Sequence, residues 1–371
     1  MEHIFLTKLE IKKVRHLKDI TIELCDKEPR HLILTGKNGS GKTSVLEAIA
    51  NQLDMLSSHN DSVTLSFCKT SNDYLSEFIN SNFILAYYQD NREFHAEETE
   101  HIEKIHLKKV YSLTDTPRDQ FVKYLADLKV TAALARTGAN TAKAEAIDNW
   151  FLQFEKMLCQ IFEDSSLYLK FDEDSFSFFI CQDGREPFTF NSMSSGFSAV
   201  MDIVLDLIMR MTNKKGRRFQ FDLPGIVLID EIETHLHLEL QKQILKILTT
   251  LFPNIQFIVS THSPFVLNTL DNVVIYDLEN HTLVNQKNGL TNLPYEGIVE
   301  GYFKVDKLSY FLKECFSQYK NLIHKSQLTD NDWEKITELE MYLNEIPDYL
   351  ALEIATEYRR LKLEFKQRED I

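Results

Sequence analysis

The sequence predicts an α/β fold with a mixed N-terminal β-subdomain, a parallel-sheet core, a helical insertion and an all-helical C-terminal tail. Continuous apolar runs at "GIVLID" and "IQFIVS" are typical of parallel strands that are buried on both faces. The opening residues alternate as strands do, in "IFLTKLEIKKV", "DITIEL" and "HLILTG". From Lys42 the apolar residues recur at helical spacing instead, so a helix should follow the third strand.

Changes in these patterns divide the chain into four expected regions. Residues 94–165 are mostly charged and helix-favouring, and strand patterns return between 167 and 190 with a turn at Asp183-Gly184. The regions are an N-terminal lobe (1–93), a helical insertion (94–165), a second lobe (166–293) and a helical module for a partner or for dimerisation (294–371).

Composition limits the classes of partner. The 371 residues include 41 Lys and Arg against 56 Asp and Glu, and this net charge of -15 disfavours binding to nucleic acid backbones. The densest basic cluster is "NKKGRRF" (213–219), which is either a solvated loop or a local nucleic-acid contact. Its basic residues are Lys214, Lys215, Arg217 and Arg218. We find neither a secretory signal nor an apolar stretch of membrane-spanning length, so we expect a cytoplasmic protein without membrane contact.

A glycine-rich loop predicts nucleotide binding. "GKNGSGKT" (36–43) matches the phosphate-binding loop and lies between an expected strand and an expected helix. Its glycines let backbone N–H groups converge on phosphates, and the helix N-terminus adds a favourable dipole. Lys42 would neutralise the β- and γ-phosphates of ATP, and Thr43 would coordinate Mg²⁺. The expected cofactor-binding residues are Asn38, Gly39, Ser40, Gly41, Lys42, Thr43 and Ser44.

The stretch "IDEIETHLH" (229–237) admits two interpretations. As the end of a buried strand, it supplies Asp230 to a Mg²⁺ shell and Glu231 as the base that activates water. The alternative is a transition-metal site built from both glutamates and both histidines. His235 and His237 are two positions apart, so on a helix their side chains would diverge by about 200°. No cysteine or third histidine lies nearby at ligand spacing, which favours the nucleotide interpretation.

Two further turns could contact phosphate. The turn Ser194-Ser195-Gly196 in "NSMSSGFSAVMDIV" precedes an amphipathic helix, and it is either an anion site or an ordinary helix cap. "FIVSTHSP" places His262 after a buried strand, at the sheet edge where the phosphate loop also emerges.

Along the chain, the phosphate loop, the Ser194-Ser195-Gly196 turn, the acidic strand end "IDEIETHLH" and the "STHSP" histidine follow one another. In this order they resemble the ABC-type ATPases, specifically the SMC/RecF/OLD-like branch. The resemblance implies a head-to-tail dimer in which two ATP molecules lie between the phosphate loop of one copy and the signature turn of the other. It implies that Ser194 and Gly196 contact the γ-phosphate in trans, and that His262 senses it. Gln89, in "AYYQDN", would touch Mg²⁺, and Arg15, in the opening hairpin, would contact the base or ribose.

The chain also departs from that family's pattern. Its signature reads Met-Ser-Ser-Gly-Phe instead of Leu-Ser-Gly-Gly-Gln, so Phe197 loses a polar contact and hydrolysis would be slow or conditional. No long heptad pattern separates loop and signature. Compact ATPases of this kind resemble those of bacterial two-gene antiviral defence systems, Septu-like and retron-linked, which implies a switch subunit that controls a separate effector. The alternative is a RecF-like DNA-repair ATPase that binds DNA through the basic cluster.

The C-terminal residues predict amphipathic helices. One helix should begin at an N-cap at Thr329 or Asp330, and Ile346-Pro347 should separate it from the next. The apolar positions along it are Leu339, Met341, Leu343 and Leu350. Such a stripe either packs on the rest of the chain or docks another subunit.

Overall fold

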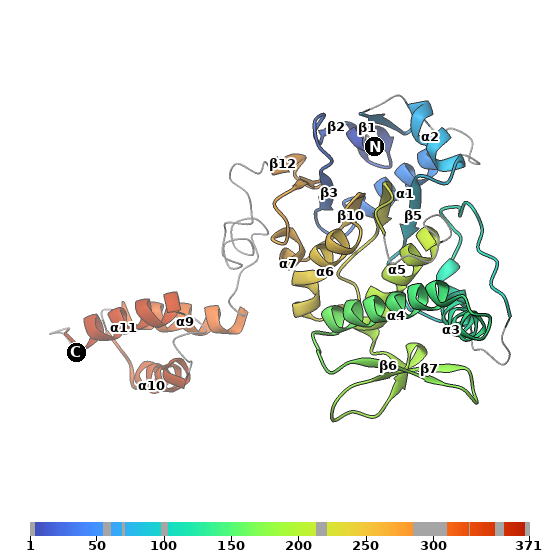
Figure 1. Cartoon of the computed structure of the whole chain (residues 1–371). Helices are drawn as coiled ribbons and strands as arrows, with labels where there is room; N and C mark the ends of the chain where they lie inside the picture. Colours follow the sequence, from blue (N-terminus) through green and yellow to red (C-terminus); the bar gives the residue numbers. More distant parts are fainter. Residues whose placement is uncertain are drawn as a thin grey trace. The chain divides into compact units, whose positions relative to one another are not determined.

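The computed structural model describes residues 4–54, 61–68, 71–97, 103–212, 221–284, 310–325, 327–345 and 352–367. The chain divides into two compact units, 1–295 and 296–371, which are described separately below (Figure 1). Three of the expectations above fall outside the described residues: the basic cluster 213–219, the helix break at 346–347, and Leu350.

The N-terminal β-subdomain is a three-stranded antiparallel sheet in the order β2-β1-β4. Its strands are β1 (Leu6–Val14), β2 (Leu17–Glu23) and β4 (Val63–Phe67). The buried residues of both strands are apolar and face the core, and the residues between them are partly or fully exposed; they are Leu6, Leu9, Ile11 and Val14 of β1 and Leu17, Ile20 and Ile22 of β2. The predicted N-terminal β-subdomain is therefore confirmed.

The core of unit 1 is a six-stranded sheet in the order β12-β11-β3-β10-β9-β5. Strands β11, β3, β10, β9 and β5 are parallel, and β12 pairs antiparallel with β11. The strands are β3 (His31–Thr35), β5 (Ile84–Tyr88), β9 (Gly225–Ile229), β10 (Ile255–Ser260), β11 (Val273–Asp277) and β12 (Thr282–Val284). Every residue of β3, β9, β10 and β11 is buried, as the apolar runs predict.

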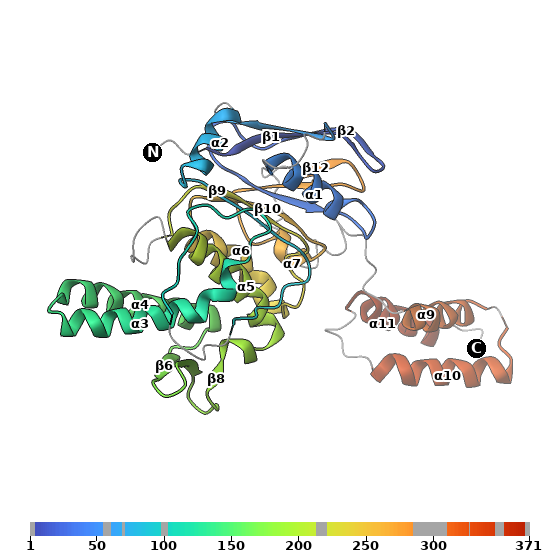
Figure 2. The ribbon, with the colours of Figure 1, turned by 90° about the vertical axis from the view of Figure 1, so that its right-hand side faces the viewer.

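Helices cover both faces of this sheet. Helix α1 (Lys42–Leu53) lies between the two sheets, and Val45, Leu46 and Ile49 share one apolar core with residues of both. Helices α5 (Ser195–Thr212), α6 (Leu238–Leu251) and the short α7 (Pro264–Leu267) lie on the opposite face (Figure 2). Helix α2 (Ser71–Ile79) follows β4. This layering confirms the predicted α/β class.

The helical part of the insertion begins later than the sequence predicts. Residues 94–97 and 103–116 contain no helix; a 3₁₀ turn (Pro117–Gln120) then leads into the antiparallel pair α3 (Phe121–Thr137) and α4 (Thr141–Phe162) (Figure 2). The backbone N–H of Phe94 donates to Ser198 Oγ at 2.9 Å, and that of Ala96 donates to Asn191 Oδ1 at 2.7 Å. The side chains of Ser198 and Asn191 thus accept the hydrogen bonds that backbone carbonyls would accept in a helix.

A small antiparallel sheet follows the insertion. It consists of β6 (Tyr168–Asp172), β7 (Ser177–Cys181) and β8 (Phe188–Thr189) in that order, and a 3₁₀ turn (Phe190–Ser192) connects it to α5. Gly184, in the predicted turn, has φ of 73°, a conformation that favours glycine. The predicted strands and turn are confirmed.

Unit 2 contains α9 (Tyr310–Ile323), α10 (Asp330–Glu345) and α11 (Leu352–Lys366) around its own apolar cluster. The Asp332 N–H donates to Thr329 Oγ1 at 3.3 Å, which confirms Thr329 as the cap of α10. Leu339 and Leu343 are buried, but Met341 is 66% exposed. Its predicted place in the apolar stripe is wrong, because a residue two positions from both leucines lies on the other side of a helix. In neither unit is any described helix long and apolar enough to cross a membrane.

Candidate nucleotide-binding site

A cavity of about 330 Å³ opens at the carboxyl edge of the large sheet. Since these strands are parallel, the loops that follow them converge on this edge. The cavity is lined by Arg15, Asn38, Gly39, Gly41, Lys42, Thr43, Ser44, Glu231 and His262. Each of these residues was predicted from the sequence, and four separate segments contribute them.

The phosphate loop joins β3 to α1 with backbone that requires glycine. Gly36 has φ of 130°, and a Cβ there would lie 2.9 Å from Ser40 Oγ and 3.2 Å from the Glu279 nitrogen. Lys42 Nζ donates to the carbonyl oxygens of Gly36 at 2.8 Å and of Lys37 at 3.2 Å. Burial lowers the pKa of Lys42, and Glu231 and neighbouring acids oppose that shift. The loop therefore presents a buried cation to the cavity, whereas Ser40 is buried and is not part of the cavity lining.

Asp230 lies beneath the cavity at 3% exposure and is fixed by hydrogen bonds. Its N–H donates to the Tyr88 carbonyl at 2.8 Å, and Ser260 Oγ donates to its carboxylate. The same Ser260 Oγ accepts from the Glu231 N–H at 2.7 Å. Sequence reasoning missed Ser260. The pairing of β9 with β10 could have found it, because the last residues of adjacent parallel strands lie side by side.

Glu231 and His262 face one another in the cavity lining. Glu231 Oε1 lies 3.2 Å from His262 Nε2, and the Glu231 backbone has φ of 44°, in the left-handed region. Glu233, which sequence reasoning also missed as a site residue, accepts a hydrogen bond from the His262 N–H at 2.5 Å. Glu233 therefore holds the backbone of His262, while the Nε2 atom of its ring lies within hydrogen-bond distance of the Glu231 carboxylate.

The two histidines of the "THLH" tail have backbone roles. His235 has φ of 68°, and His237 is the residue before α6. Among the described residues, no group of three or more His, Cys, Asp or Glu side chains gathers as metal ligands would.

The signature turn lies outside this cavity. Ser194 and Ser195 are exposed at the start of α5, while Gly196 is buried against the tail turn, residues 231–237, which follows β9. A Cβ at Gly196 would lie 3.2 Å from the His235 carbonyl, so a larger residue would push the two turns apart. Phe197 stacks on Phe162, the last residue of α4, with ring centroids 4.1 Å apart. The unusual aromatic residue of the signature therefore packs on the helical insertion.

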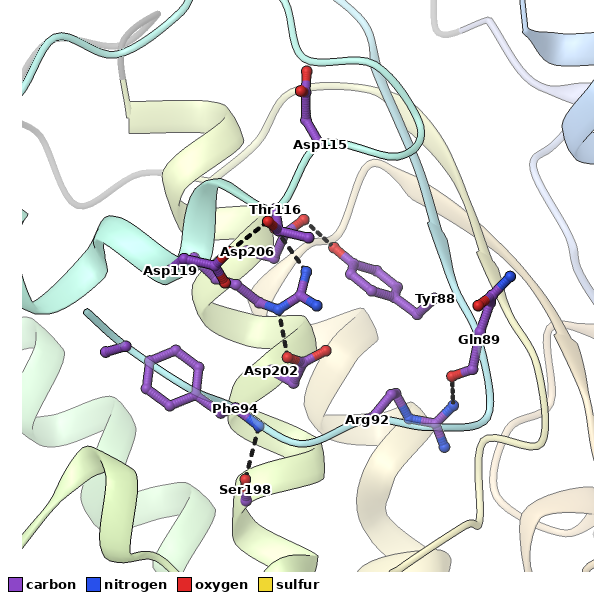
Figure 3. Close-up of polar contacts among 12 residues, drawn as sticks. Tyr88, Gln89, Arg92, Phe94, Asp115, Thr116, Asp119, Ser198, Asp202 and Asp206 are labelled. Carbon is purple, nitrogen blue, oxygen red and sulfur yellow. Dashed lines mark hydrogen bonds and ion pairs between the residues drawn. The ribbon is translucent and has the colours of Figure 1, made fainter.

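Gln89 follows β5 and is exposed, but it does not line the cavity. Its carbonyl oxygen accepts a hydrogen bond from Arg92 at 2.7 Å, and its side chain points away from that arginine (Figure 3). Its predicted contact with Mg²⁺ stays a prediction.

Comparison with known proteins supports the resemblance. The family AAA_21, described as "AAA domain, putative AbiEii toxin, Type IV TA system", matches residues 103–268. "Retron Ec83 probable ATPase" of Escherichia coli is 34% identical over 151 residues, which cover 39% of this chain and 27% of that protein. "Septu protein PtuA" of Bacillus mycoides (strain KBAB4) is 28% identical over 373 residues, 91% of this chain and 50% of that protein.

The chain thus spans half or less of the length of these two relatives. Among solved structures, a crystal structure of "the SmcHead bound to the C-winged helix domain of ScpA" aligns with a TM-score of 0.41 and 14% identity, covering 73% of this chain and 94% of that one. The chain resembles the ABC-type ATPases of the SMC/RecF/OLD-like branch and the ATPases named for retron and Septu systems.

Proposed function

We propose that this chain is an ATP-binding switch subunit that hydrolyses ATP to ADP and phosphate, dimerises head-to-tail around ATP and controls a separate effector protein in antiviral defence. The observation that carries the proposal is the cavity at the sheet edge. Its lining combines the phosphate loop with Arg15, Glu231 and His262. One cavity therefore offers a triphosphate cradle, a candidate base and a candidate phosphate sensor.

The residues around the cavity suit ATP with Mg²⁺. Buried Asp230 and exposed Thr43 offer the oxygen ligands that Mg²⁺ prefers, and Gln89 is the proposed third contact. Mg²⁺, when bound, supplies positive charge that offsets the charge of the phosphates. Lys42 would add to that charge, and Glu231 would take a proton from the attacking water.

The exposed signature turn supports action in trans. Ser194 and Ser195 lie outside their own chain's cavity, so they can meet a nucleotide only if another copy brings one. Their position at the N-terminus of α5 suits a phosphate group, because backbone N–H groups and the helix dipole point outward there. We propose that Ser194, Ser195 and Gly196 close the opposite copy's site.

Control of an effector rests on the resemblance to the ATPases of defence systems. Unit 2 is the proposed module for the partner or for dimerisation. Its described helices expose five large hydrophobic side chains: Phe311 at 58%, Trp333 at 40%, Met341 at 66%, Tyr342 at 38% and Leu363 at 60%. Assemblies larger than a dimer could be built through such a surface. The RecF-like alternative has weaker support: "DNA replication and repair protein RecF" of Rickettsia typhi is 40% identical over only 74 residues, 20% of this chain, and the net charge of -15 opposes binding to DNA.

Native mass spectrometry of the tagged protein from its own host tests the proposal. ATP turnover should fall by about 100-fold or more in Glu231→Gln, since general bases contribute that much, while ATP stays bound. We expect Glu231→Gln with ATP to yield a dimer or larger assembly that carries a second gene product. Lys42→Ala is the control, and it should stay monomeric because it lacks the phosphate contact.

Two results would redirect the proposal. A bare dimer that binds DNA at low salt would favour the repair alternative. A protein that stays monomeric with ATP and Mg²⁺ in every variant would refute the head-to-tail dimer.

A further inference from the structure

Arg92 is a buried arginine that contacts the backbone beneath the cavity. It follows β5, is 3% exposed and belongs to none of the predicted site residues. Its Nη1 donates to the carbonyl oxygens of Gln89 at 2.7 Å and of Asp230 at 2.5 Å. Its Nη2 donates to the carbonyl oxygen of Glu231 at 2.7 Å. Figure 3 shows the guanidinium directed at the Gln89 carbonyl, with α5 alongside.

These three carbonyls belong to the residues proposed for Mg²⁺ and for activating water. Hydrogen bonds from a charged donor are roughly twice as strong as neutral ones. The planar fork of a guanidinium can bridge carbonyls in two strand ends, whereas an ammonium donates from a single point. Arg92 therefore joins the end of β5 to the end of β9.

The backbone that Arg92 contacts is strained. Glu231 has φ of 44°, a left-handed conformation that residues with a Cβ adopt at a cost. Hydrogen bonds hold this residue on both sides: its N–H donates to Ser260 Oγ at 2.7 Å, and its carbonyl accepts from Arg92. Such strain persists only where surrounding groups fix it. The same conformation presents the Glu231 carboxylate to His262 in the cavity.

We propose that Arg92 is a positioning residue for ATP hydrolysis, which holds the backbone of Asp230 and Glu231 so that the Glu231 carboxylate faces the bound nucleotide. Arg92 does not line the cavity, so it acts through Glu231 and not by touching ATP. This inference rests on the proposed ATPase function.

A matched control separates positioning from general stability. Arg118 is also a mostly buried arginine near α5, with a side chain 19% exposed. Its Nε pairs with Asp202, and its Nη1 lies 3.4 Å from Asp206. In the described part of the chain, the ion pairs of Arg118 go to α5 and not to residues 230 or 231, so Arg118→Lys disturbs the same neighbourhood without touching the backbone that Arg92 holds.

The experiment compares Arg92→Lys with Arg118→Lys in the full chain. We expect Arg92→Lys to lower kcat by about tenfold or more, with the Kd for a fluorescent ATP analogue within about threefold of wild type. Arg118→Lys should keep kcat within about threefold of wild type, even if its melting temperature falls as far as that of Arg92→Lys. In a Glu231→Gln background, Arg92→Lys should change the residual rate by less than about twofold, because a residue that acts through Glu231 has nothing left to position.

Three results would overturn the inference. They are an unchanged kcat in Arg92→Lys, equal losses of kcat in both lysine variants, and a full additional loss in the Glu231→Gln background. If Arg92→Lys shows no cooperative melting, Arg92→Gln replaces it, since the amide NH2 keeps a donor group without the charge, and the same limits apply. Wild-type protein that binds ATP without turnover would refute the proposed ATPase function and the inference with it, whereas normal turnover in both Arg92 variants would refute the inference alone.

Discussion

His31 should make the stability of unit 1 depend on pH. This histidine begins β3 at 8% exposure, and its Nδ1 accepts a hydrogen bond from the Phe257 N–H at 3.1 Å. Burial lowers the pKa of His31 from 6.5 to about 4. Replacing it with glutamine keeps a polar side chain that can accept the hydrogen bond and removes the group that titrates.

The sign follows from which state binds the proton first. As pH falls below 6.5, the unfolded chain protonates at His31 while the folded chain does not until about pH 4. The neutral histidine's contribution is therefore fully present above pH 6.5 and declines as pH falls toward 4. At 1.36 kcal/mol for each pKa unit, the loss reaches about 2 kcal/mol at pH 5 and about 3 kcal/mol at pH 4.

A second buried group opposes this effect in the wild-type protein. Burial is the main cause that raises the pKa of Asp202 from 3.8 to about 6, against the pull of Arg118. The folded state therefore binds a proton at Asp202 before the unfolded state does, which stabilises the fold by about 2 kcal/mol as pH falls from 6 to about 4, similar to the loss from His31 over the same range. The two contributions nearly cancel, so only variants reveal them.

The assay is urea unfolding at pH 7.5 and pH 5. Trp150 and Trp333 are the two tryptophans, so a Trp333→Phe background lets Trp150 report on unit 1 alone. Between these pH values, the stability of wild type relative to His31→Gln should fall by about 2 kcal/mol. The stability of wild type relative to Asp202→Asn should rise between the same pH values. Parallel pH profiles for wild type and His31→Gln would refute the assignment of a depressed histidine pKa.

Two further substitutions test the packing of the large sheet and of α5 against it. Gly225→Ala places a Cβ 2.5 Å from the Ile84 carbonyl oxygen on the neighbouring strand. We therefore expect the free energy of unfolding in urea to fall by about 2–3 kcal/mol. A fall below about 0.5 kcal/mol would contradict the close approach of β5 and β9. Tyr88→Phe removes a buried hydroxyl that donates to Asp206 at 2.7 Å, so the midpoint should fall by the equivalent of about 1–3 kcal/mol, and an unchanged midpoint would show that this hydrogen bond contributes nothing.

The sequence predicts the sheet and most of the cavity because local patterns encode them. Glycines at fixed spacing require the loop backbone, and buried apolar runs that end in Asp230 or are followed by His262 place those residues at one sheet edge. The structure brings Glu231 and His262 to the loop for this reason. Arg15 also lines the cavity, but it lies between β1 and β2, and only the family resemblance pointed to it.

Residues that act through the backbone leave no such pattern. Arg92 and the carbonyl of Glu231 are 139 positions apart, and nothing in the spacing links an arginine to a distant carbonyl. Glu233 likewise holds the His262 N–H, 29 positions away. Helix propensity also failed at residues 94–97, where the N–H groups of Phe94 and Ala96 donate to the distant side chains of Ser198 and Asn191 instead of to helical carbonyls. Tertiary partners of this kind become visible only in three dimensions.

The tail turn at 231–237 has a length that cannot change. Its first residue, Glu231, faces the cavity, and its fifth, His235, has its carbonyl against Gly196 of the signature turn. Insertion of a single residue would displace one of these two contacts, because close-packed backbone has no space to absorb it. Engineered loops, tags or cleavage sites are therefore incompatible with this stretch, although His235 and His237 are exposed and it looks like an ordinary connection.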